Sequence, residues 1–174
     1  MRKHITLFLT VVAALLLTAC GGEKSVEVGP YTVTVIDPNV YHIQDYNASY
    51  PAGEYFDEEG NLTHFNNCSD IYLIVGDEAA LLIDLSNKIN WADNADASLK
   101  QLVAERIGDK PLTITFTHNH GDHLGMLPAF LEDDVHFALP RNDFGALAER
   151  VPQHKYSFFD EGHLFDLGGA KVEA

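Results

Sequence analysis

The sequence predicts a single α+β domain, and three features of the chain lead to this prediction. Two apolar runs at residues 71–75 and 79–83 are joined by a short polar turn that contains a glycine, which is typical of a β-hairpin. Helical periodicity follows at residues 93–108, and residues 112–117 alternate strictly like a strand. Strand, helix and strand in this order favour a parallel crossover, and 174 residues are enough to bury a substantial core.

The first 19 residues have the layout of a secretory leader. Arg2 and Lys3 precede an apolar run at residues 5–17, which is shorter than the roughly 20 residues that a membrane-spanning helix needs. The end of this segment, Leu-Thr-Ala-Cys20-Gly21, resembles a bacterial lipobox, in which the leader is removed before a cysteine that is then acylated. We therefore expect a lipoprotein signal peptide and a lipid anchor at Cys20; an ordinary cleaved leader is the alternative. By resemblance to lipoprotein sorting rules, Gly21 favours the outer membrane.

Removal of the leader would leave a strongly acidic, extracytoplasmic chain. The net charge is −15 at pH 7 with histidines neutral, and the loss of two basic residues with the leader would make it −17. Such a charge repels nucleic acid, so no nucleic-acid partner is expected. The acidic side chains are expected to form a solvated surface. Cys68 would be the remaining thiol, and it is expected to be a small buried residue rather than a nucleophile.

The mature chain is expected to begin with a flexible tether at residues 20–30. Residues 31–36 alternate between apolar and polar side chains and predict a strand, and residues 40–43 are expected to pair back with it. Residues 45–69 are rich in Asn, Gly, Asp and aromatic residues and predict a loop.

The central segments predict a buried sheet next to a helix. The two runs of the hairpin are apolar nearly throughout, so both faces of the sheet are expected to be covered, and the second run ends in Asp84. Asp93 or Asn94 is expected to cap the helix. The apolar face of that helix carries Leu99, Leu102, Val103 and Ile107.

Four potential metal ligands follow the strand at residues 112–117: His118, His120, Asp122 and His123. In an extended chain, positions i and i+2 project from the same side, so His118 and His120 can meet one metal ion. Gly121 would let the backbone turn sharply and bring Asp122 and His123 to the same pocket. Imidazole and carboxylate groups suit zinc. Two ions about 3.5–4 Å apart could share a water that loses its proton near neutral pH and becomes the nucleophile. A polar cluster without metal and a purely structural metal are the alternatives.

This pattern, His118-x-His120-x-Asp122-His123 after a buried strand, resembles the signature of the metallo-β-lactamase fold superfamily. The resemblance runs from about Ser69 to the end of the chain and implies an αββα sandwich. It also implies that His118 and His120 bind one zinc ion and that Asp122 and His123 bind a second. Asp122 would have a catalytic role in positioning the bridging hydroxide. Asp84 would support the metal-ligand loop through hydrogen bonds, which orient ligands and tune their basicity.

The resemblance further implies that the domain at residues 31–174 is only the N-terminal portion of the sandwich. Residues 161–172 resemble the family strand that precedes a third zinc histidine, with the strand itself placed at 164–172. That histidine, the later bridging acid and the last histidine would lie beyond Ala174, so a truncated chain is expected, or one completed by a partner chain or a dimer. His163 precedes this strand. The other histidines are expected at the surface: His42, His64, His136 and His154.

The expected function is that of a zinc-dependent hydrolase with two zinc ions per complete site. The substrate would be a small ester, lactone, thioester or β-lactam, attacked by a metal-bound hydroxide. The fold and motif do not fix the substrate, because many chemistries share them. The alternative is a non-catalytic metal-binding lipoprotein, or an inactive fragment that lacks the C-terminal metal ligands.

Overall fold

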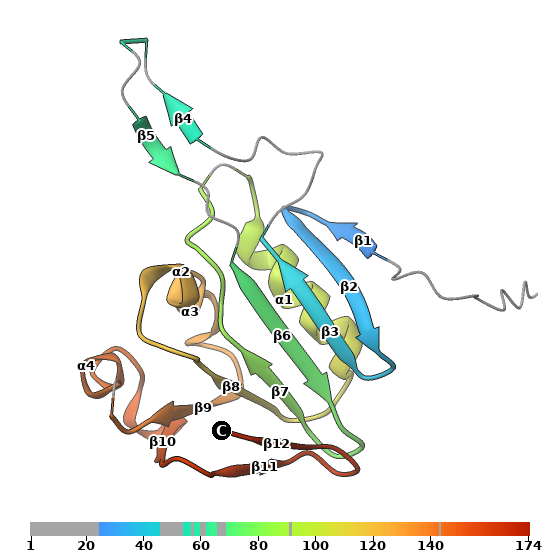
Figure 1. Cartoon of the computed structure of the whole chain (residues 1–174). Helices are drawn as coiled ribbons and strands as arrows, with labels where there is room; N and C mark the ends of the chain where they lie inside the picture. The colour runs from blue at the N-terminus through green and yellow to red at the C-terminus, as the bar shows by residue number, and fades with distance from the viewer. Residues whose placement is uncertain are drawn as a thin grey trace, which may run out of the picture.

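The computed structural model describes residues 25–45, 54–56, 58–59, 62–65, 69–90, 92–142 and 144–174 (Figure 1). The predicted signal peptide, Cys20 and Cys68 lie outside these ranges. Within these ranges, no helix combines the length and the apolar character needed to cross a membrane.

One eight-stranded mixed sheet organises the fold, with the strand order β1-β2-β3-β6-β7-β8-β9-β10. The pairs from β1 to β7 are antiparallel, and the pairs from β7 to β10 are parallel. The strands are β1 (Ser25–Val28), β2 (Tyr31–Asp37), β3 (Val40–Gln44), β6 (Asp70–Val75), β7 (Ala80–Ile83), β8 (Leu112–Thr115), β9 (Val135–Pro140) and β10 (Tyr156–Phe159). This sheet contains every strand predicted up to residue 117, including the hairpin of β6 and β7.

Helix α1 (Ala95–Ile107) forms the crossover from β7 to the parallel strand β8, as the sequence predicted. Asn94 occupies the N-cap position in the left-handed conformation (φ 58°), and its carbonyl accepts the amide of Ser98 at 2.9 Å. Gly108 ends the helix. The shorter helices are α2 (Gly121–Leu124), α3 (Leu127–Phe130), α4 (Gly145–Ala148) and the 3-10 helix η1 (Gln153–Lys155).

Strand β7 separates two apolar cores. Because successive side chains of a strand point to opposite faces, Ala80 and Leu82 pack in the larger core and Leu81 packs in a smaller one. The larger core lies between the sheet and the helices, and it includes the four predicted apolar residues of α1. The smaller core lies between the sheet and a C-terminal hairpin of β11 (Leu164–Asp166) and β12 (Lys171–Glu173).

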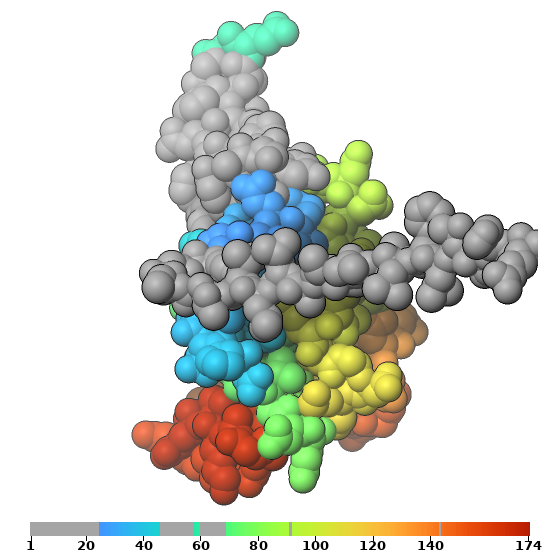
Figure 2. All heavy atoms as spheres, turned by 90° about the vertical axis from the view of Figure 1, so that its right-hand side faces the viewer, coloured from blue at the N-terminus to red at the C-terminus, as the bar shows by residue number. Residues whose placement is uncertain are grey.

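This hairpin replaces the single strand predicted at residues 164–172, and that prediction is wrong. Gly168 and Gly169 have positive φ angles of 74° and 73°, which allow the chain to reverse between β11 and β12. The turn packs against the β6–β7 turn, where the amide of Asp77 donates to the carbonyl of Gly168 at 2.7 Å. Figure 2 shows the hairpin in red at the bottom of the molecule, beside the green β6–β7 end.

Two further predictions need correction. Residues 25–28, expected within a flexible tether, form β1, because their backbone pairs with the edge of β2 from Ser25↔Thr34 to Val28↔Tyr31. The predicted loop at residues 45–69 contains a small hairpin of β4 (Glu54–Phe56) and β5 (Leu62–Phe65). Aromatic and other strand-forming residues in these two short runs favour pairing over an irregular loop.

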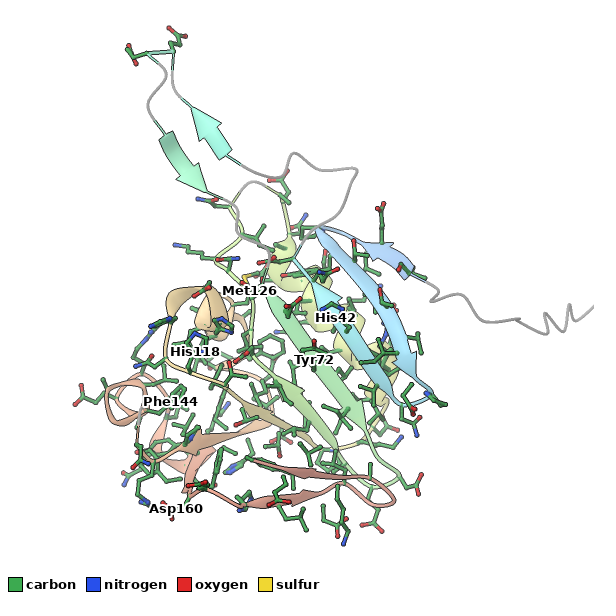
Figure 3. The ribbon with its side chains drawn as sticks, in the orientation of Figure 1. His42, Tyr72, His118, Met126, Phe144 and Asp160 are labelled. Carbon is green, nitrogen blue, oxygen red and sulfur yellow. The ribbon has the colours of Figure 1, made fainter. Side chains whose placement is uncertain are left out.

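The expectation that both faces of the sheet are covered holds for β7 and is wrong for β6. Leu81 and Leu82 of β7 are both fully buried, whereas Tyr72 of β6 is 37% exposed. On this open face, the ring of His42 from β3 stacks on Tyr72 with centroids 5.0 Å apart (Figure 3), and His42 Nε2 lies 2.7 Å from Asp70 Oδ1. A polar pair and a half-exposed aromatic ring therefore occupy this part of the sheet.

Candidate metal centre

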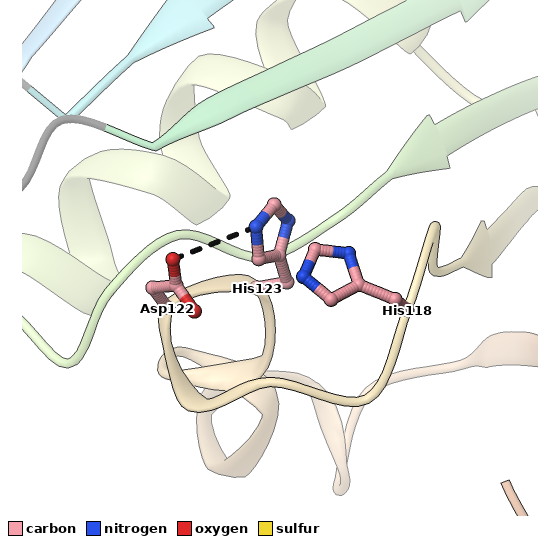
Figure 4. A group of neighbouring side chains, drawn as sticks. All are labelled: His118, Asp122 and His123. Carbon is pink, nitrogen blue, oxygen red and sulfur yellow. Dashed lines mark ion pairs between the residues drawn. The ribbon is translucent and has the colours of Figure 1, made fainter. Parts of the chain in front are cut away.

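The predicted metal ligands lie on the loop between β8 and α2. β8 ends at Thr115, residues 117–119 form a bend, and α2 begins at Gly121. His120 is still extended, with φ −115° and ψ 154°, so the helix starts directly after it. The loop thus presents His118 from its first half and Asp122 and His123 from the first turn of α2 (Figure 4).

His118, Asp122 and His123 form one compact group. Each offers a ligand atom that lies within 4.8 Å of the other two. The rings of His118 and His123 have centroids 4.0 Å apart, and His123 Nε2 lies 3.6 Å from Asp122 Oδ2. All three side chains are half-buried, so solvent and a small ligand can reach them. Two imidazoles and one carboxylate are a donor set that zinc prefers, and an open position is typical of a catalytic site. The residues therefore fit a zinc ion.

His120 is exposed and lies beside this group. Its ring packs edge-on against His118 with centroids 4.5 Å apart. The sequence predicted that His118 pairs with His120 and that Asp122 pairs with His123, whereas the structure gathers His118 with Asp122 and His123. The reason is the bend at residues 117–119, because the rule that i and i+2 share a side holds only for extended chain.

Asp84 forms hydrogen bonds with two residues of this loop region, Thr117 and His123. Its side chain is buried, and its Oδ1 accepts the backbone amide of Thr117 at 2.8 Å. Its Oδ2 accepts the Thr117 hydroxyl at 2.7 Å and lies 2.8 Å from Nδ1 of His123. A carboxylate can only accept hydrogen bonds, so Nδ1 of His123 carries the proton and its Nε2 is the atom that could bind a metal ion. Asp84 thereby fixes both the position and the tautomer of one ligand.

Thr117 sets the tautomer of His118 in the same way, and the sequence did not point to this residue. Its hydroxyl donates its one proton to Asp84, so it can only accept from Nδ1 of His118, which lies 3.0 Å away. His118 then also carries its proton on Nδ1, so its Nε2 is the atom that could bind a metal ion. The available signal was a hydroxyl residue directly before the first histidine, at the end of a buried strand.

Residues 84–87, which we call the strap, form backbone hydrogen bonds with the chain at and just after α2. The amide of Leu85 donates to the carbonyl of His123 at 2.8 Å. The amides of Gly125 and Met126 donate to the carbonyls of Ser86 and Leu85 at 2.8 and 2.9 Å. The strap therefore binds α2 through backbone hydrogen bonds on both sides of Leu124.

Gly125, rather than Gly121, is the glycine that this geometry requires. A Cβ on Gly125 would overlap the backbone of Asn87 and Lys88, whereas a Cβ on Gly121 would meet nothing within 4 Å. Gly121 is also not among the glycines with positive φ. The prediction that Gly121 is needed for a sharp turn is wrong, because the chain turns there by entering a helix.

Gly125→Ala is expected to destabilise the fold by at least about 1–3 kcal/mol, since backbone atoms of the strap must move to admit the methyl group. Thermal unfolding measures the effect. Gly121→Ala is the matched control, and it should keep the stability of the unmodified protein. Equal melting temperatures for the two variants would contradict the close packing of the strap on α2.

A cavity of about 450 Å³ lies next to the loop and touches Thr117. Its walls include Leu81 and Phe165, which belong to the smaller core. At its rim, Arg141 Nε donates to Asp160 Oδ1 at 2.9 Å. The cavity is therefore an extension of the apolar sheet face that carries the smaller core.

The comparisons with known proteins agree with this architecture. Residues 69–136 match the family model of the metallo-beta-lactamase superfamily, and this span contains Asp84 and all four predicted ligands. No curated protein matches the sequence.

Solved structures with this fold include the metallo-beta-lactamase from Pontibacter korlensis, with 21% identity and a TM-score of 0.56 over 82% of this chain and 59% of that one. Another is the metallo-beta-lactamase from Erythrobacter litoralis, with 17% identity and a TM-score of 0.52 over 81% of this chain and 56% of that one. The chain thus spans 56% and 59% of the lengths of these two structures. It has, as the sequence predicted, the metallo-β-lactamase fold over part of that fold's length, with a superfamily match at residues 69–136.

Proposed function

We propose that this chain is the metal-binding part of a zinc-dependent hydrolase. The observation that carries the proposal is the group of His118, Asp122 and His123 at the carboxyl end of β8, with Asp84 and Thr117 behind it. Zinc bound there would supply Lewis-acid chemistry, lowering the pKa of a water molecule and stabilising negative charge on a substrate oxygen.

The chain's own residues have separate roles in this proposal. Asp84 and Thr117 keep the two imidazoles in the tautomer that points Nε2 into the site. Asp122 provides a partly exposed carboxylate, which can also accept a hydrogen bond from an attacking water and so orient it. His120, whose ring packs against that of His118, is proposed as a ligand of a second zinc ion. The proposed substrate is a small molecule with an activated carbonyl: an ester, lactone, thioester or β-lactam.

The test uses the protein expressed from its complete gene and loaded with zinc. It is assayed against one representative of each of the four substrate classes. We expect hydrolysis of at least one class, loss of that hydrolysis after chelation, and recovery when zinc is restored. Zinc binding without turnover of any class would favour the non-catalytic alternative, and turnover that survives complete chelation would contradict the proposed chemistry.

We also propose that the protein is exported and anchored to a bacterial membrane through acylated Cys20. The support is the sequence alone: a basic start, a short apolar run and a lipobox-like end. Cys20→Ser is expected to move the protein from the membrane fraction to the soluble extracytoplasmic fraction, as followed by immunoblot. Cys68→Ser is the matched control and should stay with the membrane. Normal membrane retention of the Cys20 variant would overturn the proposed anchor.

A further inference from the structure

Asp45, directly after β3, is a fully buried carboxylate that sequence reasoning did not single out. Its Oδ1 accepts the backbone amide of Ser69 at 2.6 Å. Its Oδ2 accepts the hydroxyl of Ser86 at 3.0 Å, and the backbone and side-chain amides of Asn87 at 3.2 and 2.6 Å. The buried carboxylate of Asp45 thus accepts four hydrogen bonds, and all four donors are neutral groups. Such a network orders the segments that supply the donors.

Three of these four donors belong to the strap of residues 84–87. Two residues of the strap, Asp84 and Ser86, have positive φ angles of 65° and 59° without being glycine. Left-handed backbone at such residues is costly and persists only where the surroundings impose it. Asp45 holds the strap at Ser86 and at the residue after it, because it accepts from the side chain of Ser86 and from both amide groups of Asn87 at once.

The strap also contacts the loop between β8 and α2, which carries the candidate metal ligands. The Asp84 side chain holds Thr117 and His123, and the backbone of Leu85 and Ser86 holds the carbonyl of His123 and the amide of Gly125. Asp45 is therefore connected to the candidate ligands by two successive sets of hydrogen bonds, the first from Asp45 to the strap and the second from the strap to the loop that carries the ligands. The side chains in these two sets are short, and none is longer than asparagine.

Tyr31, the first residue of β2, lies near Ser86 and Asp45, and its hydroxyl is enclosed. Burial raises the pKa of Tyr31 above its ordinary value, and the nearby carboxylates of Asp45 and Asp96 raise it further. Tyr31 therefore stays neutral beside Asp45.

We infer that Asp45 is a positioning residue for the metal site, acting through the strap on His123 and Asp122. This inference rests on the proposed function in one respect, namely that His118, Asp122 and His123 bind a metal ion. It assigns to Asp45 no contact with metal or substrate. Its effect is to keep the strap in the one conformation that sets α2 against His118.

The experiment compares Asp45→Asn with the unmodified chain in two measurements. The first is amide hydrogen exchange of Leu85, Gly125 and Met126 in the metal-free protein, because these amides form the strap contacts. The second is titration with Co²⁺, whose visible absorption reports the geometry of its ligands. An asparagine presents an NH₂ group where donors converge, so we expect faster exchange at the three amides, Co²⁺ binding about tenfold weaker or more, and an altered spectrum.

Two control variants separate positioning from general stability. Ile107→Val removes a methyl group from the far end of α1, so it loosens the larger core without touching the strap. It should keep the Co²⁺ spectrum and the exchange pattern. Ser86→Ala removes a single donor to Asp45 and should show the Asp45 effect in smaller form, which keeps the test decisive if Asp45→Asn fails to fold.

The outcomes distinguish this inference from the proposed function. Faster exchange at the three amides in Asp45→Asn or Ser86→Ala supports the inference even if the unmodified chain binds no Co²⁺, a result that would count against the proposed function alone. Unchanged exchange and an unchanged Co²⁺ spectrum in both variants would overturn the inference while leaving the metal site intact.

Discussion

Asp84→Ala is expected to cost about 3–5 kcal/mol of folding stability, because it removes one member of a buried, hydrogen-bonded group. The amide and hydroxyl of Thr117 and Nδ1 of His123 would all lose their shared acceptor. The same change frees the tautomers of both imidazoles, so zinc affinity should also fall, by 10–100-fold for an outer partner of a ligand. Denaturant unfolding and zinc titration measure the two effects.

Asp70→Ala is the matched control for this prediction. Asp70 also forms a close contact with a histidine, at 2.7 Å from His42 Nε2, yet its side chain is 55% exposed. An exposed pair of this kind contributes about 0–1 kcal/mol, so the Asp70 variant should be nearly as stable as the unmodified protein and should bind zinc normally. Equal losses of stability and zinc affinity in the Asp84 and Asp70 variants would contradict the role of buried Asp84 in positioning Thr117 and His123.

His118→Ala is expected to reduce zinc affinity by more than about 100-fold, which exceeds the loss typical of an outer partner. The substitution removes one of the three ligand atoms that lie within 4.8 Å of one another, and two remaining donors are too few for a stable site. Competition with a chromophoric chelator gives the affinity. Stability should change little, because the His118 ring is partly exposed.

His136→Ala is the control for His118→Ala. His136 is exposed on β9, where its Nε2 lies 2.8 Å from the hydroxyl of Ser157. Its removal should leave zinc affinity unchanged. A comparable loss of affinity in this variant would place the zinc elsewhere and contradict the assignment of the site.

The sequence predicted the features that depend on local pattern. Two apolar runs joined by a glycine-containing turn located the hairpin of β6 and β7, and helical periodicity located α1 to within about two residues at each end. Hairpin β11–β12 escaped prediction because its two strands are three residues each, too short for a period to show. β1 escaped because its strand character depends on pairing with β2 rather than on burial of its own side chains.

The candidate site divides in the same way. The type and spacing of the four ligands were visible in the chain, and so was Asp84 at the end of a buried strand. The sequence also predicted one pocket for all four side chains, but it did not show that His118 groups more closely with Asp122 and His123, because this depends on a bend at residues 117–119. The roles of Gly125 and Asp45 were also hidden, since both depend on contacts with residues 84–88, about 40 positions away in the chain.

X-ray absorption of the zinc-loaded chain tests the central claim most directly. If His118, Asp122 and His123 hold the ion, the first coordination shell will contain only nitrogen and oxygen, with zinc–nitrogen distances of about 2.0–2.1 Å. The imidazole signal should weaken in His118→Ala and in His123→Ala. A sulfur shell near 2.3 Å, which would indicate a cysteine ligand, or a spectrum unchanged by both substitutions, would contradict the assignment of the metal centre.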